Sequence, residues 1–431
     1  MTREWRDAVG WSVLAVAGLG LTALAVRGGA QLGTAGAPFL GSYRLQLGPG
    51  TLLAPVVATV VLLVAARGWL ERAPWRVVLL WGYGATLGWA LSLAVADGAS
   101  GLTRALGSPD EYPADLAAVG DDPHHFILHF TSDATGLSVA TRGHPPAPVL
   151  LLWGLQRLGV TSHLALGVLL TAVGALTVPL VLAAVRGVCG ETPARRYLPV
   201  LALAPYAVWT AVSMDAVVAV LGAAMVAAGV RASARERTGW AATGWAGVAG
   251  LLAGVAALFS YAVPWLGLSL ALLYFARRRA FLNVASGLAA LLPLLAASLL
   301  GFSWADGLSV AHADWAARVS PNRSVLWWSG ISLVVLLLAA GPPLFASLRK
   351  VRNTPGWPFL VGAGIAVLFS LVAGLARGGV EHGWLPFFPW LTVAAVAPER
   401  QAGEAVPAPL LLAGLGALVA LVVEAVLVTP W

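Results

Sequence analysis

The chain has 431 residues, of which 59% are hydrophobic and only 10% are charged, whereas a soluble domain carries roughly 25% charged residues. Its repeated apolar runs have the length of about 20 residues that crosses a bilayer core as a helix. The net charge of +7 comes from arginines in short connectors, as the positive-inside rule requires. The composition therefore predicts an all-α, polytopic membrane protein and excludes nucleic acid as a partner. The single cysteine excludes a disulfide framework and a cysteine-based zinc cluster.

In chain order, we expect about thirteen membrane spans in a single integral membrane domain, 1–431. The expected spans are 9–26, 51–67, 76–96, 163–185, 197–212, 214–230, 241–258, 262–276, 280–302, 325–347, 357–376, 383–397 and 408–428. Region 1–75 contributes two N-terminal spans, 97–158 forms a long loop with a juxtamembrane helix, and 159–431 supplies the remaining spans. The apolar piece 147–158 has only twelve residues, too few to cross, so we expect a juxtamembrane or re-entrant helix that does not span the bilayer.

The distribution of positive charge predicts the orientation. With a cytoplasmic N-terminus and a non-crossing 147–158, eighteen of the 26 basic residues lie in cytoplasmic segments, among them 277–279, 349–352 and Arg400. If 147–158 crossed, the 277–279 and 349–352 runs would lie outside, against the positive-inside rule. We therefore predict a multi-pass protein of the plasma (inner) membrane, with loop 97–158 and the C-terminus, 429–431, on the extracytoplasmic side.

The polar stretch 97–146 interrupts the apolar sequence and concentrates its ionisable groups. It holds seven of the nineteen acidic residues and four of the seven histidines. Connectors 213–215, 260–261, 303–324 and 377–382 are predicted on the same side. Together these segments are expected to line one extracytoplasmic cavity, in which the loop carries the chemistry.

Two motifs within the loop have the residue types of acid–base chemistry. Asp110 and Glu111, followed by Tyr112, precede a short predicted helix, where carboxylates either cap the helix N-terminus or accept a proton from an attacking hydroxyl. His144 precedes Pro145-Pro146 at the start of 147–158. It is interpreted either as a hydrogen-bonded turn residue or as an acid–base or phosphate-binding group.

A third group, Asp122, His125 and His129, has the residue types of metal ligands. His125 and His129 are four residues apart and would share one helix face. The spacing matches no established zinc motif, so a polar interfacial segment is the alternative reading. No cofactor is assigned on this basis, and a divalent metal at these three residues is kept as an alternative.

Further candidates lie in the connectors predicted on the same side. Asp215 either caps the following helix or acts within the membrane, where ionisable residues are costly and often functional. Arg377, Glu381 and His382 precede an aromatic stretch typical of the membrane interface. Arg377, His382 or, alternatively, Arg318 or Arg323 would bind a lipid phosphate. The sequence contains no phosphate-binding loop of the GxxxxGK[ST] type and no GxSxG motif.

The motifs Asp110-Glu111-Tyr112 and His144-Pro145-Pro146, taken together, resemble the GT-C superfamily of membrane glycosyltransferases, in particular its protein mannosyltransferase and aminoarabinose transferase branch. The stretch 381–391 (EHGWLPFFPWL) is similar to a late-span motif of uncharacterised actinobacterial membrane proteins of this type. The resemblance implies transfer of a sugar from a polyprenyl-phosphate donor to an envelope glycan, lipid or protein, with Asp110 as general base. In this chain the loop follows the third predicted span rather than the first, and His382-Gly383 stands where a basic residue is expected.

Two other functions compete with this one. A transporter or lipid-linked sugar flippase predicts paired broken helices and an internal repeat. A non-catalytic scaffold that keeps a GT-C-like shell predicts that substitution of Asp110 or His144 has no effect.

Overall fold

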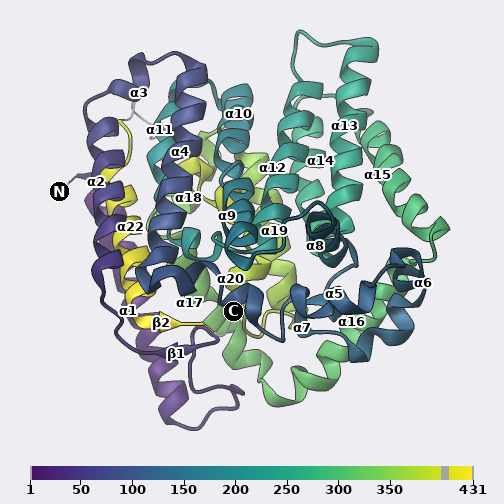
Figure 1. Cartoon of the computed structure of the whole chain (residues 1–431). Coiled ribbons are helices and arrows are strands. Elements are labelled where there is room, and N and C mark those ends of the chain that lie inside the picture. Colours follow the sequence, from purple (N-terminus) through teal and green to yellow (C-terminus); the bar gives the residue numbers. More distant parts are fainter. Residues whose placement is uncertain (1, 399–406, 430–431) are drawn as a thin grey trace.

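A computed structural model describes residues 2–398 and 407–429. The described chain is a bundle of α-helices with one two-stranded antiparallel sheet (Figure 1). This confirms the predicted all-α architecture. Arg400, predicted to be cytoplasmic, and the last two residues, Pro430 and Trp431, lie outside the described residues.

The first half of the chain contains the N-terminal spans and the polar loop. Its elements are α1 (Arg3–Arg27), β1 (Ser42–Tyr43), η1 (Pro49–Leu52), α2 (Leu53–Ala66), α3 (Trp69–Arg72), α4 (Trp75–Ala94), η2 (Val95–Leu102), η3 (Ala105–Gly107), η4 (Tyr112–Asp115), α5 (Leu116–Val119), α6 (Pro123–Asp133), η5 (Ala134–Gly136), α7 (Val139–Arg142), α8 (Ala147–Arg157), α9 (His163–Gly174), α10 (Thr177–Cys189) and α11 (Glu191–Ala202). Elements labelled η are 3₁₀ helices. The short helix expected at 147–158 is present as α8.

The second half forms the rest of the bundle. Its elements are η6 (Pro205–Trp209), α12 (Met214–Ala232), α13 (Gly239–Ala257), η7 (Val263–Leu266), α14 (Gly267–Ala276), α15 (Leu282–Leu299), α16 (Trp304–Arg318), η8 (Ser320–Asn322), α17 (Val325–Ala340), α18 (Pro343–Lys350), η9 (Val351–Asn353), α19 (Trp357–Val372), α20 (Val380–Gly383), α21 (Phe388–Leu391), η10 (Val393–Val396), α22 (Leu410–Val426) and β2 (Leu427–Val428).

Within the described residues, seven helices are long and apolar enough to cross a membrane. They are Arg3–Arg27, Pro49–Ala66, Trp75–Gly107, His163–Cys189, Met214–Ala232, Gly239–Ala257 and Leu282–Leu299. Each coincides with a predicted span. Segments Trp304–Asn322 and Val325–Ala340 form a pair bent by 99° that would make an eighth. The described helices thus support a multi-pass membrane protein, while the predicted count of about thirteen spans is not confirmed.

Proline and glycine explain why the other predicted spans differ. The predicted span 197–212 is divided between α11 and η6, because Pro205 begins a new 3₁₀ helix. The predicted span 383–397 is a series of short elements, α21 and η10, and Pro389 lies at the start of α21. Helix α17 ends at Gly341, which has a φ of +71°, so 325–347 is not one helix. Val263–Ala276, Trp357–Val372 and Leu410–Val426 remain as shorter apolar helices.

Small residues allow neighbouring helices of the bundle to approach closely. Helix α12 packs against α9, α10, α13 and α14, and α13 packs against α15. A Cβ atom at Gly250 would lie 2.0 Å from the Ser286 carbonyl oxygen, and one at Gly254 would lie 2.3 Å from that of Ala290. Helix pairs in membranes commonly rely on such small residues for van der Waals contact.

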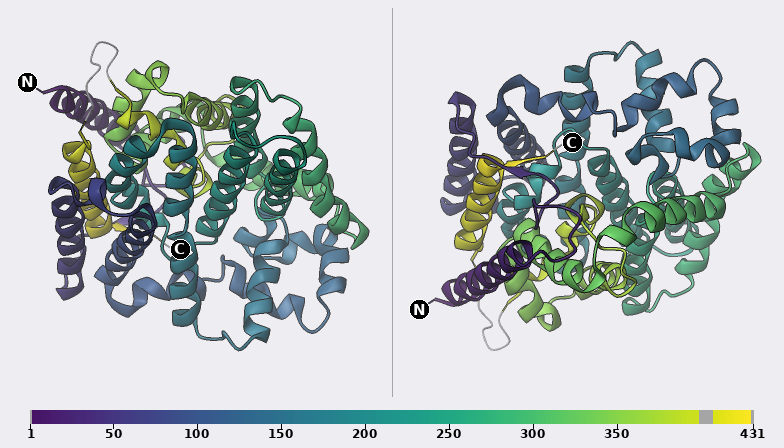
Figure 2. Two further views of the ribbon diagram at one scale, coloured as in Figure 1. Left: turned by 90° about the horizontal axis from the view of Figure 1, so that it is seen from above. Right: turned by 90° about the horizontal axis from the view of Figure 1, so that it is seen from below.

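The polar loop lies at one end of this bundle. Figure 1 shows α5, α6 and α7 at the same end as α16 and the β1–β2 pair, whereas α3 lies at the opposite end. The view from below in Figure 2 shows the loop elements along one side of that end. Asp314 on α16 forms an ion pair with Arg142 of α7 (3.1 Å), which joins α16 to the loop, and a second one with Arg318 of its own helix (2.6 Å).

Candidate functional site

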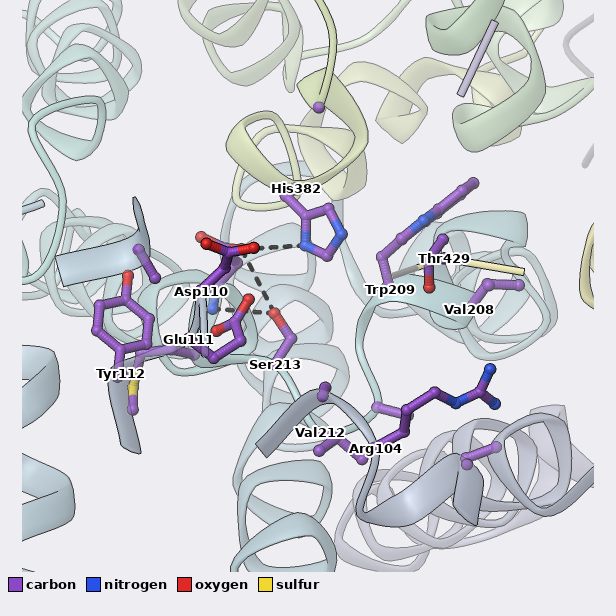
Figure 3. A pocket seen from close by; sticks show the side chains of 18 of the residues that line it. Arg104, Asp110, Glu111, Tyr112, Val208, Trp209, Val212, Ser213, His382 and Thr429 are labelled. Atoms are coloured by element: carbon purple, nitrogen blue, oxygen red, sulfur yellow. Dashed lines mark hydrogen bonds and ion pairs between the residues drawn. The ribbon is translucent and has the colours of Figure 1, made fainter. Parts of the chain in front are cut away.

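A cavity of about 380 Å³ opens where the loop meets the bundle. Its lining comes from four separate parts of the chain: the polar loop with the end of α4, the η6–α12 junction, α20 with the glycine before it, and the C-terminal end of α22 with β2 and Thr429. The polar residues of the lining are Asp97, Arg104, Asp110, Glu111, Tyr112, His144, Ser213, Asp215, His382, Glu424 and Thr429. We call this cavity the loop pocket; Figure 3 shows its interior.

Asp110 and Glu111 enter the loop pocket from a tight turn. The backbone carbonyl of Asp110 accepts a hydrogen bond from the Ala140 N–H at 2.9 Å, and the Asp110 N–H donates to Ser108 Oγ at 3.3 Å. Glu111 is the residue before η4, yet its side chain makes no capping hydrogen bond. Glu111 lines the loop pocket.

The surroundings of Glu111 make it a weak acid. Burial raises the pKa of Glu111 from 4.5 to about 7; the charge of His382 lowers it in part, whereas Asp215 and Asp110 raise it further. Tyr112 beside it is buried, and burial raises the pKa of its hydroxyl well above 10. A carboxyl group that titrates near neutrality is suited to exchange a proton with a substrate hydroxyl.

Asp215 and His382 form an ion pair across the loop pocket. Ser213 caps α12 by accepting a hydrogen bond from the Asp215 N–H at 3.1 Å. The Asp215 carboxylate lies 3.2 Å from His382 Nδ1. Burial by itself lowers the pKa of His382, but the hydrogen bond and charge of Asp215 outweigh it, and the pKa is raised above 6.5. His382 therefore favours its cationic form, next to the carboxylates of Asp215, Glu381 and Glu111.

His144 forms another wall of the loop pocket. Its Nδ1–H donates to the Ala140 carbonyl oxygen at 2.9 Å, with the tautomer assigned from this contact. Its ring packs edge-on against Tyr112 at a centroid distance of 5.9 Å. This hydrogen bond confirms the turn interpretation of His144, and the residue also lines the loop pocket. An acid–base or phosphate-binding role for His144 stays a prediction.

Arg104 is a site residue that sequence reasoning missed. It lines the loop pocket and forms an ion pair with Asp97, while Glu424 of α22 lines the same region. Figure 3 shows Arg104 apart from the cluster of Asp110, Glu111 and His382. The local sequence does not distinguish Arg104 from a surface arginine, because an aspartate only seven residues away, Asp97, suggests an ordinary local ion pair.

Backbone strain also occurs at this site. Val212 lines the loop pocket with a φ of +58°, a left-handed conformation that is rare for a β-branched residue. Its N–H donates to Thr171 Oγ1 at 3.0 Å, which holds the turn that leads into α12. Strain of this kind costs about 1–3 kcal/mol and is concentrated at functional sites.

Three sequence candidates lie outside the loop pocket. Arg318 is paired with Asp314. Arg377 donates to the carbonyl oxygens of Gly374, Ser320 and Arg323, so its guanidinium braces the backbone. Glu381 is fully buried beside the charge of Arg323. The prediction that these residues share the site with Asp110 is therefore corrected.

The residues with metal-ligand character do not form a metal centre. The Asp122 carboxylate accepts from the His125 N–H at 3.0 Å and caps α6. The rings of His125 and His129 lie 4.1 Å apart between centroids and are tilted by 36° to one another. Among residues 2–398 and 407–429, no three His, Cys, Asp or Glu side chains converge to hold a metal ion.

Comparison of the chain with family models, with curated proteins and with solved structures finds no match. Any assignment of function to the loop pocket therefore depends on its own residues. Those residues supply carboxylates, one of which titrates near neutrality, a histidine paired with an aspartate, and an arginine, all next to helices that are apolar enough to lie in a membrane.

Proposed function

We propose that the protein is a membrane glycosyltransferase of the GT-C type, which transfers a sugar from a polyprenyl-phosphate donor to an envelope glycan, lipid or protein. The observation that carries the proposal is the convergence of Asp110, Glu111, Tyr112, His144, Asp215 and His382, from three distant parts of the sequence, on one pocket. The resemblance to GT-C enzymes singles out Asp110, Glu111, Tyr112 and His144 among them, whereas Asp215 and His382 were candidates on their residue types alone.

The proposed reaction is a single displacement. Asp110 accepts the proton of the acceptor hydroxyl while the hydroxyl oxygen forms a bond to the anomeric carbon of the sugar. The bond from that carbon to the phosphate oxygen breaks, and polyprenyl phosphate leaves as an anion. General-base assistance of this type contributes about 10²- to 10⁴-fold in rate.

The remaining side chains have distinct tasks in this proposal. Protonated His382 and Arg104 are the cations that stabilise the negative charge developing on the phosphate. Glu111, with its pKa of about 7, shares protons with Asp110. Asp215 is a positioning residue, because its hydrogen bond orients the His382 ring.

The proposed orientation follows the positive-inside rule. The N-terminus is cytoplasmic, and the loop pocket opens on the extracytoplasmic face of the plasma membrane, where polyprenyl-linked sugars and envelope acceptors meet. The arginine runs 277–279 and 349–352 then lie on the cytoplasmic side.

The test is turnover of labelled polyprenyl-phosphate sugars by the purified full chain in detergent or liposomes. We expect a labelled product with the wild type and a loss of about 10²- to 10⁴-fold with Asp110→Asn. Asp133→Asn is the matched control, since Asp133 is an exposed carboxylate in the same loop that does not line the pocket. Equal activity of the two variants rules out Asp110 as base.

The competing functions predict different outcomes, the transporter in liposomes and the scaffold in cells. A transporter or flippase moves labelled donor across liposomes without forming product. A scaffold forms no product, and its cellular phenotype survives substitution of Asp110 or His144.

A further inference from the structure

A second cavity, of about 1040 Å³, lies at the other end of α12 from the loop pocket. Asp215, at the start of α12, lines the loop pocket, whereas Val230 and Arg231, near its end, line this cavity. A helix of 19 residues at 1.5 Å per residue separates the two by about 28 Å. The cavity is therefore a separate site, which we call the arginine pocket.

The arginine pocket has a strongly one-sided charge. Its lining includes seven arginines and one acidic residue, Glu236. The arginines are Arg186, Arg231, Arg235, Arg237 and the run Arg277, Arg278 and Arg279. Such an excess of like charge in a concave wall creates a positive potential that attracts anions.

Two of these arginines build the wall itself. Arg277 donates from one terminal nitrogen to the Val230 carbonyl oxygen at 3.2 Å and from the other to that of Gly187 at 2.5 Å. Arg279 donates to the carbonyl oxygens of Arg235 and Arg237. These bonds occupy carbonyl groups near the ends of α10 and α12 that lack helical partners, so they hold the pocket in shape.

Three others are oriented by tryptophan rings or by a carboxylate. The Arg186 guanidinium lies 4.6 Å from the ring centroid of Trp75 and pairs with Glu191 at 2.6 Å. Arg231 and Arg237 approach the ring of Trp245 at 5.0 and 5.6 Å. Cation–π contacts of this kind restrict the side chains while leaving their N–H groups able to donate.

The last two have no such role. The guanidinium groups of Arg235 and Arg278 make no hydrogen bond or ion pair within residues 2–398 and 407–429, and both side chains are exposed at the pocket. Arg278 has a φ of +56°, a conformation that favours glycine. A charged residue kept in a strained turn, next to other arginines, indicates a function beyond stability.

The clustered positive charges of these arginines repel one another, and a bound anion would relieve this repulsion. Burial lowers the pKa of the Arg277 guanidinium; the charge of Glu236 opposes this, whereas those of Arg235 and Arg279 lower the pKa further. The positive-inside rule accounts for arginines in this connector. It does not require them to converge on a cavity or to leave two of them without partners.

We propose that the arginine pocket binds a phosphate-bearing anion. The guanidinium fork matches the oxygens of a phosphate group and donates two parallel hydrogen bonds to it. Trp75, Trp357 and Leu273 give the same cavity apolar walls. Two sources supply this chemistry, the head group of an anionic phospholipid and a soluble phosphate compound. The proposal is independent of the transferase proposed above.

The test uses the full chain in neutral detergent micelles, titrated with two probes. One probe is short-chain diphosphatidylglycerol, compared with zwitterionic short-chain phosphatidylcholine, and the other is inorganic pyrophosphate. Calorimetry and the rise in unfolding temperature measure binding, since a ligand of the folded state stabilises it by mass action. We expect saturable binding of at least one anionic probe by the wild type, and none of phosphatidylcholine.

The decisive variant is Arg235→Gln/Arg278→Gln, which removes the two unpartnered guanidiniums. We expect it to bind the anionic probe about 30-fold more weakly, the loss for two cation–phosphate contacts. The matched control is Arg3→Gln/Arg6→Gln, which removes two exposed arginines at the predicted cytoplasmic end and should leave affinity unchanged. If the glutamine variant does not fold, Arg235→Lys/Arg278→Lys takes its place, because it keeps the positive charge and removes the guanidinium fork. We expect this variant to bind the anionic probe several-fold more weakly than the wild type.

Each result decides the proposal. If the Arg235/Arg278 variants lose affinity only for diphosphatidylglycerol, the ligand is a lipid head group. If they lose affinity only for pyrophosphate, the ligand is a soluble phosphate compound. The proposal is overturned if neither anion binds the wild type, if the Arg235/Arg278 variants bind like the wild type, or if Arg3→Gln/Arg6→Gln loses as much affinity.

Discussion

Glu111→Gln should change how the stability of the protein depends on pH. Burial raises the pKa of Glu111 from 4.5 to about 7, so the folded protein holds this proton more tightly than the unfolded chain does. The stabilisation that results is fully present below pH 4.5 and is lost as the pH rises through about 7. Glutamine mimics the protonated form at every pH, so the variant keeps this stabilisation in alkaline solution.

The size of the effect follows from the two pKa values. A rise from 4.5 to about 7 corresponds to about 3 kcal/mol at roughly 1.36 kcal/mol per pKa unit. Because the pocket admits solvent on one side, this figure is an upper limit. At pH 4 the free energies of unfolding of wild type and variant should agree, and at pH 8.5 the variant should be the more stable by up to about 3 kcal/mol.

The assay is denaturant unfolding in detergent micelles at pH 4, 7 and 8.5, followed by tryptophan fluorescence. Asp133→Asn, an exposed carboxylate of the same loop, serves as the control and should stay within about 0.5 kcal/mol of the wild type. A Glu111→Gln variant whose stability follows the wild type from pH 4 to 8.5 would refute the argument that burial governs Glu111.

Two further predictions concern packing and the ion pair. Gly362→Ala places a Cβ atom 2.5 Å from the backbone nitrogen of Ser269, so it should destabilise the contact of α19 with α14 by about 1–3 kcal/mol. Gly364→Ala, whose Cβ atom meets nothing within 4 Å, should be neutral or stabilising. Equal changes in the free energy of unfolding for the two variants would contradict the packing of α19 on α14. Asp215→Asn removes the charge that favours protonated His382, so the NMR titration of the His382 ring should move to lower pH, and an unchanged titration argues against the pair.

Hydrophobic run length predicted the continuous spans correctly and failed where proline or glycine interrupts an apolar run. All seven long apolar helices of the described chain overlap predicted spans, although Trp75–Gly107 extends well beyond the predicted 76–96 and Arg3–Arg27 begins before the predicted 9–26. The run 383–397 is as apolar as they are, yet Pro386 and Pro389 divide it into short elements. Hydropathy reflects the free energy of transferring side chains from water to an apolar phase. A membrane-spanning helix also requires continuous backbone hydrogen bonds, which proline interrupts.

The site could be predicted as far as topology determines it. Placing the loop and the start of α12 on the same side brought Asp110 and Asp215 into one pocket. Topology does not specify where a long side chain ends. Arg377 satisfies backbone carbonyl groups instead of facing the pocket, while Arg104 faces it. An arginine that braces backbone and one that lines a site look alike in a sequence, because only the fold determines which carbonyl oxygens lack partners.

The most direct test of the proposed transferase is an experimental structure of the full chain with a short polyprenyl phosphate. We expect the phosphate inside the loop pocket, within hydrogen-bonding distance of His382 or Arg104, with the anomeric oxygen facing Asp110. A phosphate bound outside this pocket, with the wild-type loop pocket empty at saturating ligand, contradicts the proposal.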